Sequence, residues 1–291
     1  MRKIRTKGDL VFDICNYALM AVLMLICIYP LWYVVIGSIS DAQQVSMGNV
    51  ILLPKGFNLD AYKQTLSTEN ILVSYANTIY YSIVGVALSM LFTVLGAYPI
   101  SKNRLHGKKF FTIFFSISMW FTAGMMPSYV TYDMLGLIDT RLGVLLSGLL
   151  STFNLIIMRT AFQGVPDSLE ESMKLDGASD TQILIHCYLP LTVPTFMTLV
   201  LFYFVTRWNT YWWPMIILKD SAKIPLQVLL KKLVVEMQGL FENMEGRDIT
   251  KVSQETMVYS TMVIAVAPML ILYPFIQRFF VKGVTVGAVK G

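Results

Sequence analysis

The residues best suited to chemistry gather in one short stretch, residues 164–190. It carries five carboxylates and one lysine, namely Asp167, Glu170, Glu171, Asp176 and Asp180 against Lys174. Paired carboxylates can act as a general acid and base, which a membrane enzyme that acts on lipid-linked substrates would need. The same residues can instead form an acidic surface that receives a basic protein partner.

Few other side chains could support catalysis or bind a cofactor. His106 and His186 are the two histidines and lie in separate polar segments, and the three cysteines show no metal-ligand spacing. The sequence has no phosphate-binding loop of the form G-x-x-x-x-G-K-[ST]; the nearest string, HGKKF, lacks the upstream glycine and the hydroxyl residue. We therefore predict no catalytic residue, no metal, no disulfide and no cofactor bound by this chain.

The composition indicates an all-α integral membrane protein. Hydrophobic residues make up 55% of the 291 residues and charged residues only 14%, and the mean hydropathy is +0.60. The net charge of +5 could suggest a nucleic-acid partner. Because the basic residues stand in short clusters beside apolar runs, they are better explained as topology signals. We expect membrane lipid, and no nucleic acid, around the chain.

Six apolar runs are long enough to cross a bilayer as helices. They cover roughly residues 11–38, 73–99, 110–130, 143–163, 191–214 and 256–279. The first run is too long for a cleaved signal peptide, so we expect a retained helix. Lysines and arginines lie in both tails and in the connection between the second and third runs. By the positive-inside rule they place both termini and residues 164–190 in the cytoplasm. Residues 1–291 are thus predicted to form one polytopic transmembrane domain.

Two loops on the opposite side also carry helical patterns. Pro54 and Gly56 mark a turn before a short amphipathic stretch within residues 40–70, and leucines recur on one helical face within residues 215–255. Helices that lie on the membrane surface are the simpler interpretation. A docking surface for an external protein is the alternative.

Residues 164–190 have the pattern of two short helices around a glycine. A helix can begin after Pro166 and run to about Asp176, Gly177 permits a turn, and a second helix should end at Pro190. Cytoplasmic loops usually carry lysine and arginine, so a loop whose acidic residues point at the cytosol suggests a basic partner. A plain connection between spans is the alternative.

The string ESMKLDGA, residues 171–178, is followed by Pro190 thirteen residues after Gly177, within YLPLTVP. This spacing of glutamate, glycine and proline between the fourth and fifth spans resembles the EAA loop of permeases from binding-protein-dependent ABC importers. Ser172 and Met173 replace the two alanines of the family pattern. The resemblance implies a coupling helix between the fourth and fifth transmembrane helices, which docks on a separate ATPase.

The end of the fifth span, TRWNTYWWPMIIL, and the tail QRFFVKGVTVGAVKG resemble the maltose-permease type of carbohydrate importer, in particular the MalG-like subunit and its lipopolysaccharide and polysaccharide permease relatives. This resemblance covers nearly the whole chain. It implies a non-catalytic permease subunit in the bacterial cell membrane that imports an oligosaccharide or other carbohydrate. The implied partners are a second homologous permease, a cytoplasmic ATPase dimer that binds ATP-Mg, and an extracellular sugar-binding lipoprotein. A permease for a peptide or another small solute is the alternative, and an ion channel would need a selectivity-type loop.

By the same resemblance, two segments contact the ATPase. In the coupling loop, residues 164–190, the contacting residues are Glu170, Glu171, Lys174, Asp176, Gly177 and Pro190, with Glu171 facing a basic residue of the ATPase. In the tail, residues 280–291, they are Lys282, Gly283, Gly287 and Lys290. A frayed tail is the alternative for the second segment.

Polar and aromatic residues near the outer end of the fifth span could contact a saccharide, through ring stacking and hydrogen bonds to hydroxyls. The candidates are Arg207, Trp208, Asn209, Tyr211 and Trp212, with Asn154 in the fourth span. Arg207 lies sixteen residues after Leu191, in the outer part of the bilayer. There it could instead extend to the interface beside an aromatic belt. Both the structural interpretation and the cavity or gate interpretation stay open.

Overall fold

The computed structural model describes residues 7–67, 69–243, 255–271 and 274, and all regular structure within those residues is helical. The prediction of an all-α protein is confirmed for this part of the chain. The chain divides into two units, Met1–Glu69 with Lys232–Val266, and Asn70–Lys231 with Ala267–Gly291. Each unit has its own core of buried side chains.

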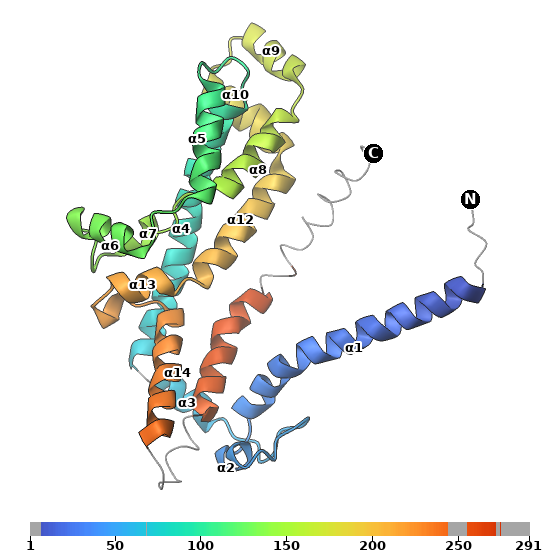
Figure 1. Ribbon diagram of the computed structural model, residues 1–291, viewed down its shortest axis with the longest axis vertical. Coiled ribbons are helices and arrows are strands. Elements are labelled where there is room, and N and C mark those ends of the chain that lie inside the picture. Colours follow the sequence, from blue (N-terminus) through green and yellow to red (C-terminus); the bar gives the residue numbers. More distant parts are fainter. Residues whose placement is uncertain (1–6, 68, 244–254, 272–273, 275–291) are drawn as a thin grey trace. The chain divides into compact units, whose positions relative to one another are not determined.

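The first unit begins with α1 (Lys7–Ser38), drawn in blue in Figure 1. Its stretch Gly8–Ser38 is long and apolar enough to cross a membrane, and only 6% of its most apolar window is buried inside the chain. Two short helices follow, α2 (Ala42–Ser46) and α3 (Asp60–Ser67). Tyr259, from the apolar helix Glu255–Ile271, packs with buried residues of the first fifty positions in a small core.

The remaining helices begin at Glu69. They are α4 (Glu69–Ser101), α5 (Lys108–Trp120), α6 (Met125–Met134), α7 (Arg141–Leu146), α8 (Thr152–Gln163), α9 (Asp167–Leu175), α10 (Asp180–Ile183), the π-helical turn η1 (Leu184–Tyr188), α11 (Leu189–Leu191), α12 (Val193–Trp208), α13 (Trp212–Ile217), the 3₁₀ turn η2 (Ser221–Lys223) and α14 (Leu226–Asn243).

Three apolar runs that the sequence predicts as continuous spans are broken helices. α5 and α6 meet at an angle of 114°, with Gly124 at φ +79° before α6. α7 and α8 are separated by residues 147–151, where Gly148 has φ +66°, and α12 and α13 are separated by residues 209–211. A count of apolar residues cannot distinguish one helix from two shorter ones, because the residues at the first two breaks are mostly small or apolar and the third break is only three residues long.

Two helical stretches among the described residues are each long and apolar enough to cross a membrane, Gly8–Ser38 and Ile71–Ser101. Up to four spans result if each of two bent helix pairs counts as one span. The second of these pairs joins Asp180–Leu191 to Val193–Ile217 at 85°. The chain is therefore a multi-pass membrane protein by the length and composition of its helices.

α4 carries a stripe of small residues that lets its neighbours approach closely. Ser82, Gly85, Ser89, Thr93 and Gly96 recur every three or four residues along it. The Thr93 hydroxyl lies 2.7 Å from the hydroxyl of a tyrosine on α12, and a Cβ built on Gly96 would lie only 3.0 Å from a leucine methyl of α8. Figure 1 shows α4, α8 and α12 running alongside one another. Close approach at small residues is a common way to associate helices in lipid.

Three aromatic rings join the ends of these helices. Tyr98 of α4, Phe162 of α8 and Tyr188 of η1 pack edge to face in all three pairs, with ring centroids 5.3 to 6.1 Å apart. Phe162 is 1% exposed and Tyr188 is 2% exposed. Edge-to-face pairs add a directional preference to the burial of the rings. The cluster therefore fixes where residues 164–190 leave α8 and where they join the fifth apolar run.

Replacing Phe162 with alanine should lower the free energy of unfolding by about 3–5 kcal/mol, because it leaves a cavity between two tyrosine rings. Thermal unfolding of the purified chain in detergent would measure the loss. Phe153→Ala is the matched control, since Phe153 lies on the same helix and is 52% exposed. Equal loss in both variants would contradict this account of the cluster.

Candidate functional site

The charged loop folds as two short helices around a glycine, as its sequence predicts. α9 ends at Leu175 and Gly177 follows with φ +80°. The amide of Gly177 donates to the carbonyl of Lys174, and that of Ala178 donates to the carbonyl of Met173. This pair of bonds is a Schellman cap, which needs a left-handed residue at the position of Gly177.

The second helix begins with a capping box and ends at Leu191, within one residue of the predicted end. Ser179 accepts from the amide of Gln182, whose side chain in turn accepts from the amide of Ser179. Helical backbone then continues through Pro190 to Leu191. Pro190 has no amide to donate, and the helical stretch ends one residue later, where the chain changes direction.

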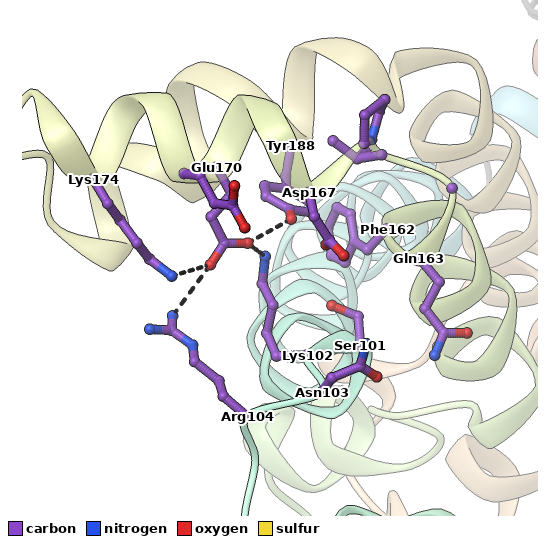
Figure 2. A pocket seen from close by; sticks show the side chains of 14 residues that line it. Ser101, Lys102, Asn103, Arg104, Phe162, Gln163, Asp167, Glu170, Lys174 and Tyr188 are labelled. Atoms are coloured by element: carbon purple, nitrogen blue, oxygen red, sulfur yellow. Dashed lines mark hydrogen bonds and ion pairs between the residues drawn. The ribbon is translucent and has the colours of Figure 1, made fainter.

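Glu170 is the centre of the site, and it points inward. Its residue is only 6% exposed although it lies on a surface helix. Lys102 and the Tyr188 hydroxyl donate to Oε2, the latter at 2.7 Å. Lys174 donates to Oε1 at 2.5 Å, and the Arg104 guanidinium lies 3.7 Å from the same oxygen. Figure 2 shows these four donors converging on one carboxylate.

The donors are themselves held in place. The Lys102 ammonium lies 3.4 Å from the ring centroid of Tyr188 and 4.5 Å from that of Tyr98, within the range of cation–π attraction. Arg104 makes a second ion pair, with Asp180 at the start of α10. The cluster thus links the end of α4, both helices of the charged loop and the turn η1.

Electrostatics keep Glu170 ionised. Burial alone would raise its pKa, but hydrogen bonds from Lys102, Lys174 and Tyr188 outweigh burial and lower the pKa from 4.5 to about 2. The hydrogen bond to Asp180 raises the pKa of Arg104 above its usual value. Removing one member of such a buried group leaves an uncompensated charge, which typically costs about 3–5 kcal/mol.

A polar cleft of about 520 Å³ lies beside this cluster, where α8 ends and α9 begins. Figure 2 shows its lining, which includes Ser101, Asn103, Gln163 and Asp167 together with members of the cluster. The lining mixes basic and acidic side chains. Within the described residues no group of three or more histidines, cysteines or carboxylates could hold a metal ion.

The structure brings together only some of the residues that the sequence singles out in the loop. Glu170 and Lys174 belong to the cluster, whereas Glu171 and Asp176 are exposed. The expectation that the acidic residues all point at the cytosol is wrong for Glu170, because basic residues from another connection cover it.

Lys102, Arg104 and Tyr188 are the site residues that sequence reasoning missed. The sequence carries one related signal: the apolar Met173 lies three residues after Glu170 on the same helical face, which indicates that Glu170 faces inward but does not identify its partners.

The candidates for the solute path separate into two sets. Asn154, Arg207 and Trp208 are buried, whereas Asn209, Tyr211 and Trp212 are exposed at the break between α12 and α13. Of the two interpretations left open for Arg207, extension to the membrane interface is contradicted, because its guanidinium donates to main-chain carbonyls inside the protein. The tail candidates Lys282, Gly283, Gly287 and Lys290 lie outside the described residues.

Comparison with known proteins gives consistent matches along nearly the whole chain. Residues 2–286 match the family described as "Binding-protein-dependent transport system inner membrane component". The chain is 37% identical over 281 residues to the polygalacturonan/rhamnogalacturonan transport system permease protein YtcP of Bacillus subtilis (strain 168), covering 96% of this chain and 98% of the relative. It is 35% identical over 286 residues to Protein LplC of the same organism, covering 98% and 97%.

A solved structure is similar as well. It is the crystal structure of a bacterial ABC transporter involved in the import of the acidic polysaccharide alginate. One of its chains is 38% identical to this chain and superposes with a TM-score of 0.87. The match covers 95% of this chain and 99% of that chain.

The ion-pair cluster should stabilise the protein only while Glu170 is ionised. Because its folded pKa is depressed, the stabilisation is complete above pH 4.5 and is lost as the pH falls toward 2. The pKa difference corresponds to about 3 kcal/mol. Thermal unfolding of the purified chain between about pH 6 and pH 3 would show about 2 kcal/mol of this loss.

Glu170→Gln should remove much of this acid sensitivity and lower stability at neutral pH. Glu171→Gln is the matched control, and its pH profile should follow that of the wild type because Glu171 is exposed. Identical profiles for the wild type and Glu170→Gln would show that the cluster does not set the acid response.

Proposed function

We propose, because this chain belongs to the family of inner membrane components of binding-protein-dependent transport systems, that it forms half of the translocation path of an ATP-driven importer. The family inferred from residues 171–178 is thereby confirmed. Permeases of this family transport solutes and are not enzymes, so the acidic loop serves coupling rather than acid–base chemistry. The chain would pair with a second homologous permease around the path.

The imported solute is proposed to be a carbohydrate, and an acidic oligosaccharide in particular. The relative YtcP is named for polygalacturonan and rhamnogalacturonan transport, and the similar solved structure belongs to an importer of alginate. All three polymers contain uronic acids, which carry a carboxylate on the sugar ring. These names favour carbohydrate over peptide, the alternative substrate class.

We propose six membrane spans with both termini in the cytoplasm. The spans would be α1, α4, the pair α5 and α6, the pair α7 and α8, the run from α11 to α13, and the helix that begins at Glu255. The contacts of Lys102 and Arg104 with the charged loop support this order, because they put the second and fourth connections at one end of the helices. Basic residues at that end indicate the cytoplasmic side.

The coupling loop would engage a cytoplasmic ATPase dimer that binds ATP-Mg. Its two adjacent glutamates support a division of roles. Glu170 anchors α9 from within, while Glu171 is exposed and free to face a basic residue of the ATPase. Leu175 is 89% exposed at the tip of α9 and would add apolar contact to that interface. A rigid helix with a charged and apolar outer face suits the transfer of ATPase closure to the helix bundle.

Two further contacts complete the proposal. Residues 280–291 would reach the ATPase as a second point of contact. On the opposite side, an extracellular sugar-binding lipoprotein would deliver the solute. The exposed residues Asn209, Tyr211 and Trp212 would contact the solute along the path. Arg207 is not assigned such a contact, because its guanidinium is buried among main-chain acceptors.

Glu171→Ala and Gly177→Asp should each lower solute import at least about tenfold while membrane insertion stays normal. The first removes the charge at the ATPase interface, and the second puts a side chain on a backbone with φ +80°. The measurement is ATP-dependent uptake of a radiolabelled oligogalacturonide by the complete transporter in proteoliposomes, with the binding protein present.

Ser172→Ala is the matched control, because Ser172 is an exposed neighbour whose hydroxyl bonds only within α9. It should import at the wild-type rate. Normal import by both test variants would refute the coupling role of the loop. Wild-type uptake that needs neither ATP nor the binding protein would refute the importer itself.

A further inference from the structure

Arg207 places its guanidinium at the C-terminal end of α7. Nη1 donates to the carbonyls of Ser147 at 2.7 Å and Val144 at 3.2 Å. Nη2 donates to the carbonyl of Leu145 at 3.0 Å and to the hydroxyl of Ser89 on α4 at 3.3 Å. The last carbonyls of a helix have no partner within it, and a guanidinium offers several donors in a fixed plane. Arg207 thus caps α7 from another helix.

The capped end leads directly into a break in the fourth apolar run. Residues 147–151 are not helical, and Gly148 adopts φ +66°. Inside a bilayer, backbone groups outside a helix must find partners in the protein. Tyr203, one turn before Arg207, provides the other partner: its hydroxyl accepts from the amide of Ser151 at 3.1 Å. Two side chains of α12 therefore hold both edges of the break.

α4 leaves room for this arrangement. A Cβ built on Gly85 would lie 3.0 Å from Nε of Arg207 and 3.1 Å from its Cδ. Ser89, one turn further, accepts one of the guanidinium bonds, and Thr93 pairs with the hydroxyl of Tyr203. The small residues of α4 thus make room for Arg207 and Tyr203, the two side chains that bond to the residues around the break.

The coupling loop connects α8, which follows the break, to α12, which carries Arg207 and Tyr203. The loop begins where α8 ends, and it leads through η1 and α11 into α12. Glu170 ties the loop to α4 at that end, and Arg207 ties α7 to α12 beyond the break. A flexible break would let α7 lag behind a moving loop. A capped break transmits the movement.

We propose that Arg207 is a positioning residue for transport. It locks α7 to α12, so that the far part of the fourth apolar run moves with the coupling loop as one rigid piece. This inference rests on the proposed function. A lysine could not replace the arginine, because one ammonium group cannot reproduce a planar set of bonds to three carbonyls and a hydroxyl.

A pair of spin labels can measure the rigidity directly. One label replaces Leu142 on α7 and the other replaces Thr206 on α12, both exposed positions, after Cys15, Cys27 and Cys187 have been exchanged for serine or alanine. Distances are recorded in the complete transporter, with its partner permease, ATPase dimer and binding protein. They are recorded without nucleotide and with a non-hydrolysable ATP analogue. ATP hydrolysed per solute imported is measured alongside.

In the wild type the label distance should be the same in both states. In Arg207→Lys it should broaden, or shift by about one helical turn (~5 Å), when the analogue binds. The ATP hydrolysed per imported solute should rise about tenfold. Arg141→Lys is the matched control, since Arg141 lies at the start of α7 and contacts Asn77 and Tyr80 of α4 rather than the carbonyls at the break; it should leave both readings unchanged.

Three results would overturn the inference. The first is a wild-type distance that changes by a turn or more between the two states, which is informative even if Arg207→Lys does not assemble. The second is an Arg207→Lys transporter with wild-type distances and coupling. The third is a lower amount of assembled transporter with an unchanged ATP-to-solute ratio, which would mark a purely structural role. Failure of the proposed function would look different, as absence of ATP-dependent uptake by the wild type.

Discussion

A buried carboxylate must be surrounded by donors, and the arrangement around Glu170 follows from that requirement. Once α9 packs against the end of the bundle, this side chain loses its water and needs replacements from the protein. They come from its own helix, from the end of α4 and from η1. Any tilt of α9 would uncover the charge. Losing any one of these donors would leave the buried charge short of a partner, which costs about 3–5 kcal/mol.

The protein uses a second polar anchor at the other end of the same helices, and the chemistry differs with the surroundings. At the end beside the basic connection, the anchor is a set of ion pairs. Beside the break in the fourth apolar run, the arginine is matched with neutral carbonyls. A carboxylate would be costly to insert there, whereas helix-end carbonyls already need donors. In each case the ionised side chain and the polar groups around it supply hydrogen-bond partners that water does not provide there.

The sequence predicts the helical class, the charged loop and its turn, because these depend on local spacing. Gly177 illustrates this, since its left-handed backbone is required by the cap of α9 alone. The roles of Glu170 and Glu171 are harder to tell apart, because adjacent helical positions differ by about 100° and only the packing of α9 decides which faces inward. The partner Lys102 is 68 residues away in sequence. No local pattern connects the two.

The breaks in the apolar runs were unpredictable for a similar reason. Residues 147–151 contain leucine, serine and glycine, all of which occur within continuous membrane helices. What stabilises the interruption is Arg207, whose depth could be counted from Leu191 but whose acceptors lie on two other helices. A buried arginine on an apolar helix is therefore a cue to look for interrupted backbone nearby.

The capping of α7 also has an electrical consequence. Among the described residues, no carboxylate lies within ion-pair distance of Arg207, so carbonyl dipoles spread its charge without cancelling it. In surroundings poor in water, the potential of such a charge falls off slowly with distance. The C-terminal end of α7 offsets only about half of a unit charge, so a net positive charge remains beside the break.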